Sequence, residues 1–452
     1  MTMTTPLHYE SIENLSRILR RREIGAVEIV EHFLRRTDAL NNLLHAVITV
    51  AYDHARAAAA EADRSMAAGS ADGKPLLGIP ITVKDVMATK GIRTTANSRT
   101  LGDWVPDAEP LALARLREAG AIVLAKANCN EYFGIPSEDD RYPRPRTPFN
   151  TDYVAIGSSS GSGVAVAAGI GAASIGTDSA GSVRLPAAQA GAFGMKSTNG
   201  HVSLEGHTAY SNFQVIGPLA RTTADAALLT SVMAGEAPPT ISTAGPRGLR
   251  IGVPWRYIDT SPAEPEIRSA FRSLIETLEA AGAQVVEVSI PGMAESRMAT
   301  FVAMYAEHHA SKAVTLQRQF NDLGRSARLY AMQGAFISAV DYLHMLELGR
   351  QVRRNVDLAL GTVDVIAMPT SPYVTAEAAR RPSEHRRGMN TVFTVPFNLT
   401  GHPAITVPCG FSELGIPIGA QFAAAHGAED TLYRVSLAVE QLTDWHLRHP
   451  PL

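Results

Sequence analysis

The chain has 452 residues, of which 45% are hydrophobic and 6% aromatic, enough apolar material for a large core. Its 41 basic and 44 acidic side chains nearly balance, which gives no electrostatic reason to expect a nucleic-acid partner or an anionic membrane surface. Two cysteines in so long a chain predict a reducing compartment and argue against a disulfide framework.

The N-terminal residues lack the basic and apolar regions of a signal peptide. No uncharged apolar run reaches the roughly 18 residues that a membrane-spanning helix needs. We therefore expect a cytoplasmic protein without a membrane partner.

Apolar periodicity predicts alternating helices and strands along the chain. Helices are expected over about 9–43 (two of them), 55–68, 111–119 and 267–281, and strands over about 77–83, 121–125, 173–175, 248–253, 285–290 and 363–368. Such alternation predicts a layered α/β architecture with a mostly buried sheet. Two irregular stretches interrupt it: 236–247, a surface loop or a boundary between halves, and the proline-rich 136–153. Loops as long as the second are usually functional.

The stretch IGSSSGSG at 156–163 places four serines on a backbone with almost no bulky side chains. A flexible linker is disfavoured, because an apolar helix start follows at once at Val164. A phosphate-binding loop is disfavoured, because no lysine follows and Val166 stands where the dinucleotide motif needs glycine. The string Gly157–Gly161 matches G-x-S-x-G, which would make Ser159 the nucleophile of an α/β-hydrolase-type esterase, but no clear strand precedes it.

A fourth interpretation uses a second glycine- and serine-rich segment, Gly176–Pro186. Its Ser182 follows Ser158 by 24 residues, and the helix, turn and strand between them can bring the two together. A serine is a poor nucleophile without a base. Lys84 ends the apolar strand, where it is either an exposed lysine that reaches water or a buried amine with a lowered pKa that can accept a proton.

These motifs together resemble the amidase signature family. The two serine segments and Lys84, 74 residues before Ser158, have the family's spacing. Similar segments continue at 215–222, 393–408 and 415–419. The resemblance implies an α/β fold with a central mixed, mostly buried β-sheet covered by helices on both faces. It also implies a single amidase domain over 1–452, with N-terminal helices at about 9–68, a signature core at about 74–235 and a second part of the sheet at about 248–440.

The resemblance also implies residue roles. Lys84 is the terminal base, Ser158 the bridging serine after a cis peptide bond from Gly157, and Ser182 the nucleophile. The backbone N–H groups of Ser179, Ala180, Gly181 and Ser182 face the oxyanion. Asp178 and Arg184 organise the loop. The relay needs no metal and no cofactor.

The chain departs from the family around these motifs. Ile156, Ser160 and Ala180 stand where glycine is common, and the segment 147–150 and the loop 129–146 lack the usual sequence. Because that loop forms part of the pocket wall in the family, the departures leave the substrate open. The side chains expected to contact substrate are Tyr132, Phe133, Arg146, Tyr305, His308 and His402.

The expected function is hydrolysis of a small-molecule carboxylic amide, or of a urea- or carbamate-like C–N bond, through a serine acyl-enzyme. Two alternatives remain: the glutaminase subunit of a tRNA-dependent amidotransferase, which normally keeps the pocket loop that this chain lacks, and the esterase using Ser159. The expected partner is a small-molecule amide and not a nucleic acid, and a homodimer stays open.

Overall fold

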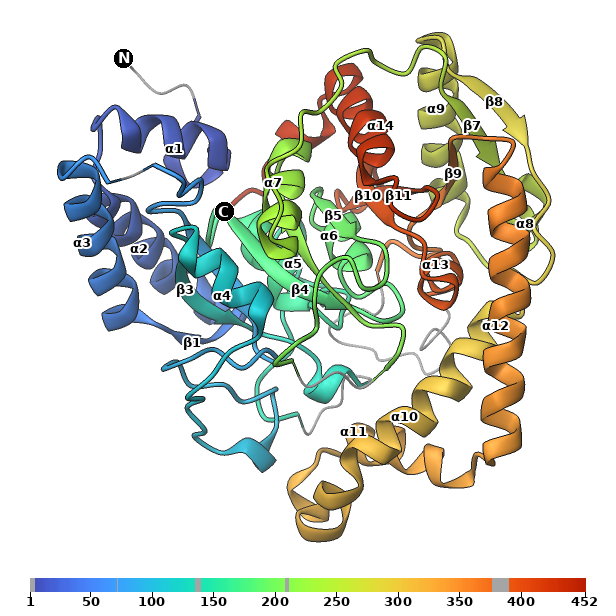
Figure 1. Cartoon of the computed structure of the whole chain (residues 1–452), viewed down its shortest axis with the longest axis horizontal. Helices are drawn as coiled ribbons and strands as arrows, with labels where there is room; N and C mark the ends of the chain where they lie inside the picture. The colour runs from blue at the N-terminus through green and yellow to red at the C-terminus, as the bar shows by residue number, and fades with distance from the viewer. Residues whose placement is uncertain (1–4, 71, 135–139, 208–210, 376–389) are drawn as a thin grey trace.

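An 11-stranded β-sheet organises the chain in the order β1-β3-β2-β4-β6-β5-β10-β11-β9-β7-β8 (Figure 1). The computed structural model describes residues 5–70, 72–134, 140–207, 211–375 and 390–452. The strands are β1 (Val47–Val50), β2 (Pro80–Lys84), β3 (Ile122–Ala127), β4 (Ala173–Asp178), β5 (Phe193–Lys196), β6 (Val215–Ala220), β7 (Arg250–Val253), β8 (Gln284–Glu287), β9 (Val365–Pro369), β10 (Ala404–Phe411) and β11 (Pro417–Ala423).

The sheet is mixed. β3, β2 and β4 are parallel neighbours, as are β8, β7 and β9, whereas the strands between these two groups pair antiparallel. Most strands are buried along their whole length, because helices cover the sheet. The expected α/β fold with a mixed, mostly buried sheet is confirmed.

The helices surround this sheet, with α1–α3 near its β1 end and α9 beside β7 and β8 (Figure 1). The α-helices are α1 (Ile12–Arg20), α2 (Ala26–Leu44), α3 (Tyr52–Ala67), α4 (Leu111–Glu118), α5 (Ser160–Ala168), α6 (Arg184–Gln189), α7 (Thr223–Ala234), α8 (Trp255–Thr260), α9 (Pro265–Ala280), α10 (Ser296–Arg318), α11 (Arg325–Gln333), α12 (Ala339–Leu360), α13 (Val395–Thr400) and α14 (Glu429–Leu442). Each helix and strand expected from the sequence is present within a few residues of its expected bounds. In the described part of the chain, no helix is long and apolar enough to cross a membrane.

Helices α10, α11 and α12 form an arm that the sequence analysis did not anticipate. They project away from the sheet, and α10 packs against α12 and diverges from it toward α11 (Figure 1). The short helix α13 packs against both of them and leads into β10. The arm is therefore coupled to the sheet through α13.

The parallel strands β3, β2 and β4 end at one edge of the sheet. Val83 pairs with Ile175 in this register, so Lys84 lies beside the last residues of β4. Helix α5 begins at the same edge, where the Gly161 N–H donates to the Asn128 carbonyl oxygen at 2.8 Å. Ligands of open α/β sheets commonly bind outside the carboxyl ends of the strands. The serine-rich segment and Lys84 thus meet where a site is expected.

Close packing explains why a glycine stands at position 161 of the serine-rich segment. A Cβ atom built at Gly161 would lie 2.3 Å from the Ala46 carbonyl oxygen and 2.4 Å from the Asn128 nitrogen. Both atoms belong to the backbone, so neither can rotate away. Glycine at 161 therefore lets the first turn of α5 touch the end of β3.

We predict that Gly161→Ala lowers the free energy of unfolding by about 1–3 kcal/mol, because the added methyl overpacks this contact. Ser162→Ala is the matched control. Its buried hydroxyl has no hydrogen-bond partner among the described residues, so its removal should be neutral or stabilising. Denaturant unfolding of both variants measures the difference. Equal stability of Gly161→Ala and the unmodified chain would contradict the prediction.

Candidate active site

Lys84 is fully buried at the carboxyl end of β2, and its amine meets two hydroxyl groups. Lys84 Nζ lies 2.8 Å from Ser158 Oγ and 2.9 Å from Thr177 Oγ1. Ser158 is 3% exposed, so the contact is shielded from water. No carboxylate forms an ion pair with this lysine in the ranges that the structure describes.

Burial lowers the pKa of Lys84 to about 7, although the negative charge of Asp178 acts in the opposite direction. A large fraction of the amine is therefore neutral near neutral pH and can accept a proton. The Phe133 ring helps to shield it, because its centroid lies 5.0 Å from Lys84 Nζ. The edge-to-face contact of Phe133 with His207 extends this apolar wall.

The peptide bond between Gly157 and Ser158 is cis. Asn130 supports it: the Asn130 N–H donates to the Ser158 carbonyl oxygen at 3.2 Å. A Cβ atom at Gly157 would lie 2.6 Å from Asn130 Oδ1, so glycine is required for this close approach.

Ser159 lies apart from this contact. Its Oγ is buried and donates to the Thr177 carbonyl oxygen at 3.3 Å. No histidine or lysine pairs with this hydroxyl in the described ranges, and no regular strand precedes it. The geometry therefore gives the esterase alternative neither a base nor the strand–turn–helix that its motif needs.

The second glycine- and serine-rich segment wraps around the buried carboxylate of Asp178. Its Oδ1 accepts the Gly181 N–H at 2.7 Å, and its Oδ2 accepts the Val183 N–H at 3.2 Å. Arg184 Nε lies 3.0 Å from Oδ2, and Asn398 Nδ2 donates to Oδ1 at 2.8 Å. Burial alone would raise the pKa of Asp178, but the Arg184 charge and these hydrogen bonds hold it well below its usual range. The carboxylate thus stays ionised and fixes the loop.

This arrangement corrects one expectation from the sequence. The Gly181 N–H was expected to face an oxyanion, but it points at Asp178 and is already used. The N–H groups of Ser179, Ala180 and Ser182 donate to no other residue in the described structure. Three backbone N–H groups, rather than four, are therefore available to an oxyanion.

Ser182 is more exposed than the other two residues of the expected relay. Its side chain is half-buried, whereas Lys84 and Ser158 are buried, so Ser182 is the one that solvent reaches. Within the described residues, no hydrogen bond joins Ser158 to Ser182. In unliganded enzymes such contacts are often long and tighten when substrate binds.

Phe133 lies beside Lys84, and Tyr132 precedes it in the chain; both have a left-handed backbone (φ 44° and 68°). The Tyr132 hydroxyl bonds Thr100 Oγ1 at 2.6 Å, and Lys312 Nζ of α10 lies 3.3 Å from the Tyr132 ring centroid. Tyr305 and His308 occupy the same helix and pack edge-on against Tyr330 of α11. Their contact with substrate stays a prediction.

His402 and Arg146 are both hydrogen-bonded to protein groups. His402 is fully buried, with Nε2 2.9 Å from Asp357 Oδ1 and Nδ1 2.8 Å from Thr400 Oγ1. Both ring nitrogens bond to protein, so His402 joins α13 to α12, and its contact with substrate stays a prediction. Arg146 lies near the end of α2, where its Nη1 donates to the Thr151 carbonyl oxygen at 3.1 Å. Its described hydrogen bonds are to the carbonyl oxygens of Leu44 and Thr151, and not to Lys84 or either serine.

The sequence analysis missed several residues that shape the site. Thr177 Oγ1 contacts Lys84, and Thr394, Asn398 and Gln421 bond to the Asp178–Arg184 segment or its neighbours. Thr177 lies between Gly176 and Asp178 of the recognised motif, and Thr394 and Asn398 lie in the segment 393–408. The resemblance to the family covered the segments that contain Thr177, Thr394 and Asn398, but only the fold shows which of their atoms are in contact.

Comparison with known proteins agrees with this geometry. The model of the Amidase family matches residues 28–433. The chain belongs to the amidase family. One relative, the A subunit of the glutamyl-tRNA(Gln) amidotransferase of Roseiflexus sp. (strain RS-1), is 36% identical over 488 aligned residues that cover 99% of each chain.

Solved structures of the amidase fold superpose along nearly the whole chain. One described as "Crystal structure of amidase" has 31% identity and a TM-score of 0.87, covering 96% of this chain and 99% of its own. The A subunit of the Thermotoga maritima glutamyl-tRNA(Gln) amidotransferase has 27% identity and a TM-score of 0.81, covering 98% and 96%. The amidase family is the one that the sequence motifs indicated.

We predict that Phe133→Ala raises the pKa of Lys84 above about 7, because water replaces the ring and the charged ammonium is then better solvated. Since Lys84 loses its proton as pH rises through its pKa, the neutral amine should appear only at higher pH in the variant. An NMR titration of ¹³C-labelled lysine, assigned with Lys84→Met, measures this shift.

Phe149→Ala is the control for this titration, because Phe149 packs against Phe411 and not against Lys84. This substitution should leave the pKa of Lys84 unchanged. An unchanged Lys84 pKa in Phe133→Ala would show that the ring does not set the solvation of the amine.

Proposed function

We propose that this amidase-family chain hydrolyses a carboxamide through a serine acyl-enzyme, with Ser182 as nucleophile, Ser158 as bridging serine and Lys84 as terminal base. The observation that carries the proposal is the buried, partly neutral amine of Lys84 within 2.8 Å of Ser158 Oγ. A hydroxyl needs such a base to become an effective nucleophile.

In the first half-reaction, Ser158 passes its proton to Lys84 as it takes the proton of Ser182. Ser182 Oγ then forms a bond to the substrate carbonyl carbon. The developing oxyanion accepts hydrogen bonds from the N–H groups of Ser179, Ala180 and Ser182, which supply preorganised electrostatic stabilisation. When the tetrahedral adduct collapses, the C–N bond breaks, and Ser158 protonates the leaving nitrogen and regains a proton from Lys84.

In the second half-reaction, water attacks the acyl-enzyme ester, and the same residues remove its proton. The acid product leaves, and Ser182 regains its hydrogen. Asp178 and Arg184 hold the loop throughout. Each proton stays within the relay or leaves on a product, so the cycle needs no external acid or base.

For the substrate, the comparisons support the glutaminase of an amidotransferase more than the stand-alone hydrolase that the sequence analysis placed first. The relative from Roseiflexus and another from Chloroflexus aggregans, 37% identical, are both A subunits of a glutamyl-tRNA(Gln) amidotransferase. We therefore propose the side-chain amide of glutamine as the first substrate to test, with ammonia as the leaving group.

A stand-alone amidase is the second candidate. The alignment with the Roseiflexus relative spans 488 positions, more than the 452 residues of this chain, so that relative carries segments that this chain lacks. The loop 129–146, which includes the wall residues Tyr132 and Phe133, also departs from the usual family sequence. A pocket wall with a different sequence favours a different substrate, even where the catalytic lysine and serines are the same.

We predict ammonia release from glutamine in a panel that also contains aliphatic amides, aryl amides and biuret. The panel measures kcat/KM for the purified chain by coupled ammonia detection or amine release. Turnover of glutamine above the other amides supports the amidotransferase-type function. Turnover of a neutral amide without turnover of glutamine would contradict it and support the stand-alone hydrolase.

The identity of the nucleophile is tested with two serine variants. We predict that Ser182→Ala lowers kcat by at least about 10³-fold, since the acyl-enzyme cannot form, and that it prevents labelling by a sulfonyl fluoride. Ser159→Ala should retain labelling at the Ser182 peptide, because Ser159 Oγ only bonds backbone. A label on Ser159 in the unmodified chain would overturn the assignment.

A further inference from the structure

Thr394 lies directly before α13, 214 residues from the loop that it contacts. Its buried Oγ1 lies 2.8 Å from the Ala180 carbonyl oxygen and 3.2 Å from the Thr391 carbonyl oxygen. Because a hydroxyl has one hydrogen, the shorter contact to Ala180 is the stronger one. Thr394 therefore holds a backbone oxygen inside the loop that bears Ser182.

The peptide unit between Ala180 and Gly181 is held at both ends. Thr394 binds its carbonyl oxygen, and Asp178 Oδ1 accepts its N–H, the Gly181 N–H, at 2.7 Å. A peptide unit is planar, so two opposed hydrogen bonds fix its orientation. The unused N–H groups of Ala180 and Ser182 belong to the peptide units on either side of it.

Close packing strengthens this hold. Gly181 has φ +111°, and a Cβ atom there would lie 2.3 Å from Thr394 Oγ1 and 2.7 Å from Thr394 Cβ. The side chain of Thr394 thus rests against the Gly181 backbone. The loop cannot move toward α13 without displacing Thr394.

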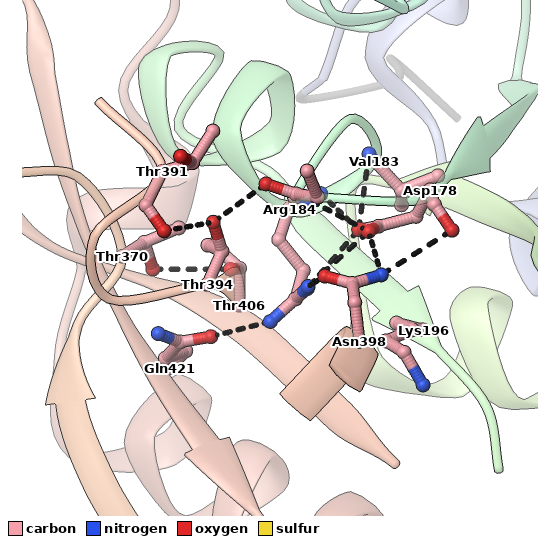
Figure 2. A network of polar contacts seen from close by, with 12 residues as sticks. Asp178, Val183, Arg184, Lys196, Thr370, Thr391, Thr394, Asn398, Thr406 and Gln421 are labelled. Carbon is pink, nitrogen blue, oxygen red and sulfur yellow. Dashed lines mark hydrogen bonds and ion pairs between the residues drawn. The ribbon is translucent and has the colours of Figure 1, made fainter. Parts of the chain in front are cut away.

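Thr394 is itself fixed by the surrounding network (Figure 2). One turn along α13, Asn398 Nδ2 donates to Asp178 Oδ1 at 2.8 Å. Gln421 of β11 accepts from Arg184 Nη1 at 2.8 Å and donates to the Phe393 carbonyl oxygen, next to Thr394, at 2.7 Å. The N-terminal end of α13 and the loop therefore form one bonded unit.

We propose that Thr394 is a positioning residue for transition-state stabilisation: it fixes the Ala180–Gly181 peptide unit so that the N–H groups of Ala180 and Ser182 face the oxyanion. The inference rests on the proposed function, in which these groups stabilise the tetrahedral adduct. Donors aimed at developing charge act mainly on kcat. Loss of the Thr394 hydroxyl should therefore lower kcat and leave KM nearly unchanged.

The test compares Thr394→Val, which removes the hydroxyl and keeps the branched shape, with Thr394→Ser, which keeps the hydroxyl. We expect Thr394→Val to lower kcat by roughly 10- to 100-fold, less than the loss of a direct donor. Affinity for an aldehyde or boronic acid that forms the adduct with Ser182 should fall by a similar factor. Thr394→Ser should retain kcat within a few-fold.

Thr406→Val is the matched control. Thr406 is a buried threonine of β10 beside this network (Figure 2); among the described contacts, its Oγ1 bonds Thr370 Oγ1 at 3.0 Å and no residue of the loop. It should leave kcat and analogue affinity within about two-fold, whatever its effect on the melting temperature. A similar loss of kcat in Thr406→Val and Thr394→Val would assign the effect to general packing and overturn the proposal.

Two further outcomes separate this inference from the proposed function. Normal kcat and analogue affinity in Thr394→Val, together with an inactive Ser182→Ala, would overturn only the role of Thr394. Normal turnover in Ser182→Ala would overturn both. If Thr394→Val does not fold, Thr394→Ala removes the hydroxyl without adding a methyl group, and it must show the same fall in kcat at constant KM.

Discussion

The buried carboxylate of Asp178 holds together both the loop that bears Ser182 and the segments that pack against it. Taking an ion pair out of water is costly, and the pair with Arg184 offsets this cost only when further hydrogen bonds satisfy both groups. Here three loop N–H groups, Asn398 and Gln421 complete the set. Because these partners come from the loop after β4, the start of α6, α13 and β11, the Asp178–Arg184 pair joins segments from distant parts of the chain at the site.

Lys84, on the neighbouring strand β2, is also a buried ionisable group, but it is not paired with an opposite charge. It is buried beside hydroxyl groups and an aromatic ring, without a carboxylate partner in the described ranges, so desolvation lowers its pKa to about 7. Pairing keeps Asp178 charged, whereas isolation lets Lys84 become neutral. The fold thus places an ionised carboxylate and an amine with a lowered pKa at the same edge of the sheet, as the proposed mechanism requires.

The proposed catalytic residues and the side chains beside them come from different parts of the chain. The residues of the proposed relay are Lys84, the last residue of β2, Ser158, two residues before α5, and Ser182, in the loop between β4 and α6. The Phe133 ring contacts His207, from the segment between β5 and β6, and the neighbouring Tyr132 ring contacts Lys312 of α10, a helix of the projecting arm. A substitution in these segments can therefore change the surroundings of Phe133 while Lys84 keeps its place at the end of β2.

Apolar periodicity, a local property of the chain, predicted six of the eleven strands of the described sheet (β2, β3, β4, β7, β8 and β9) and the helices α1–α4 and α9. Motif spacing, also local, singled out Lys84, Ser158 and Ser182 as candidate site residues. The sequence by itself did not determine which way individual groups point. The Gly181 N–H turns to Asp178, and His402 is sequestered against α12. Thr394 reaches a loop 214 residues away. Hydrogen-bond direction and contact between distant segments depend on how the sheet and α13 pack, so only the tertiary structure decided them.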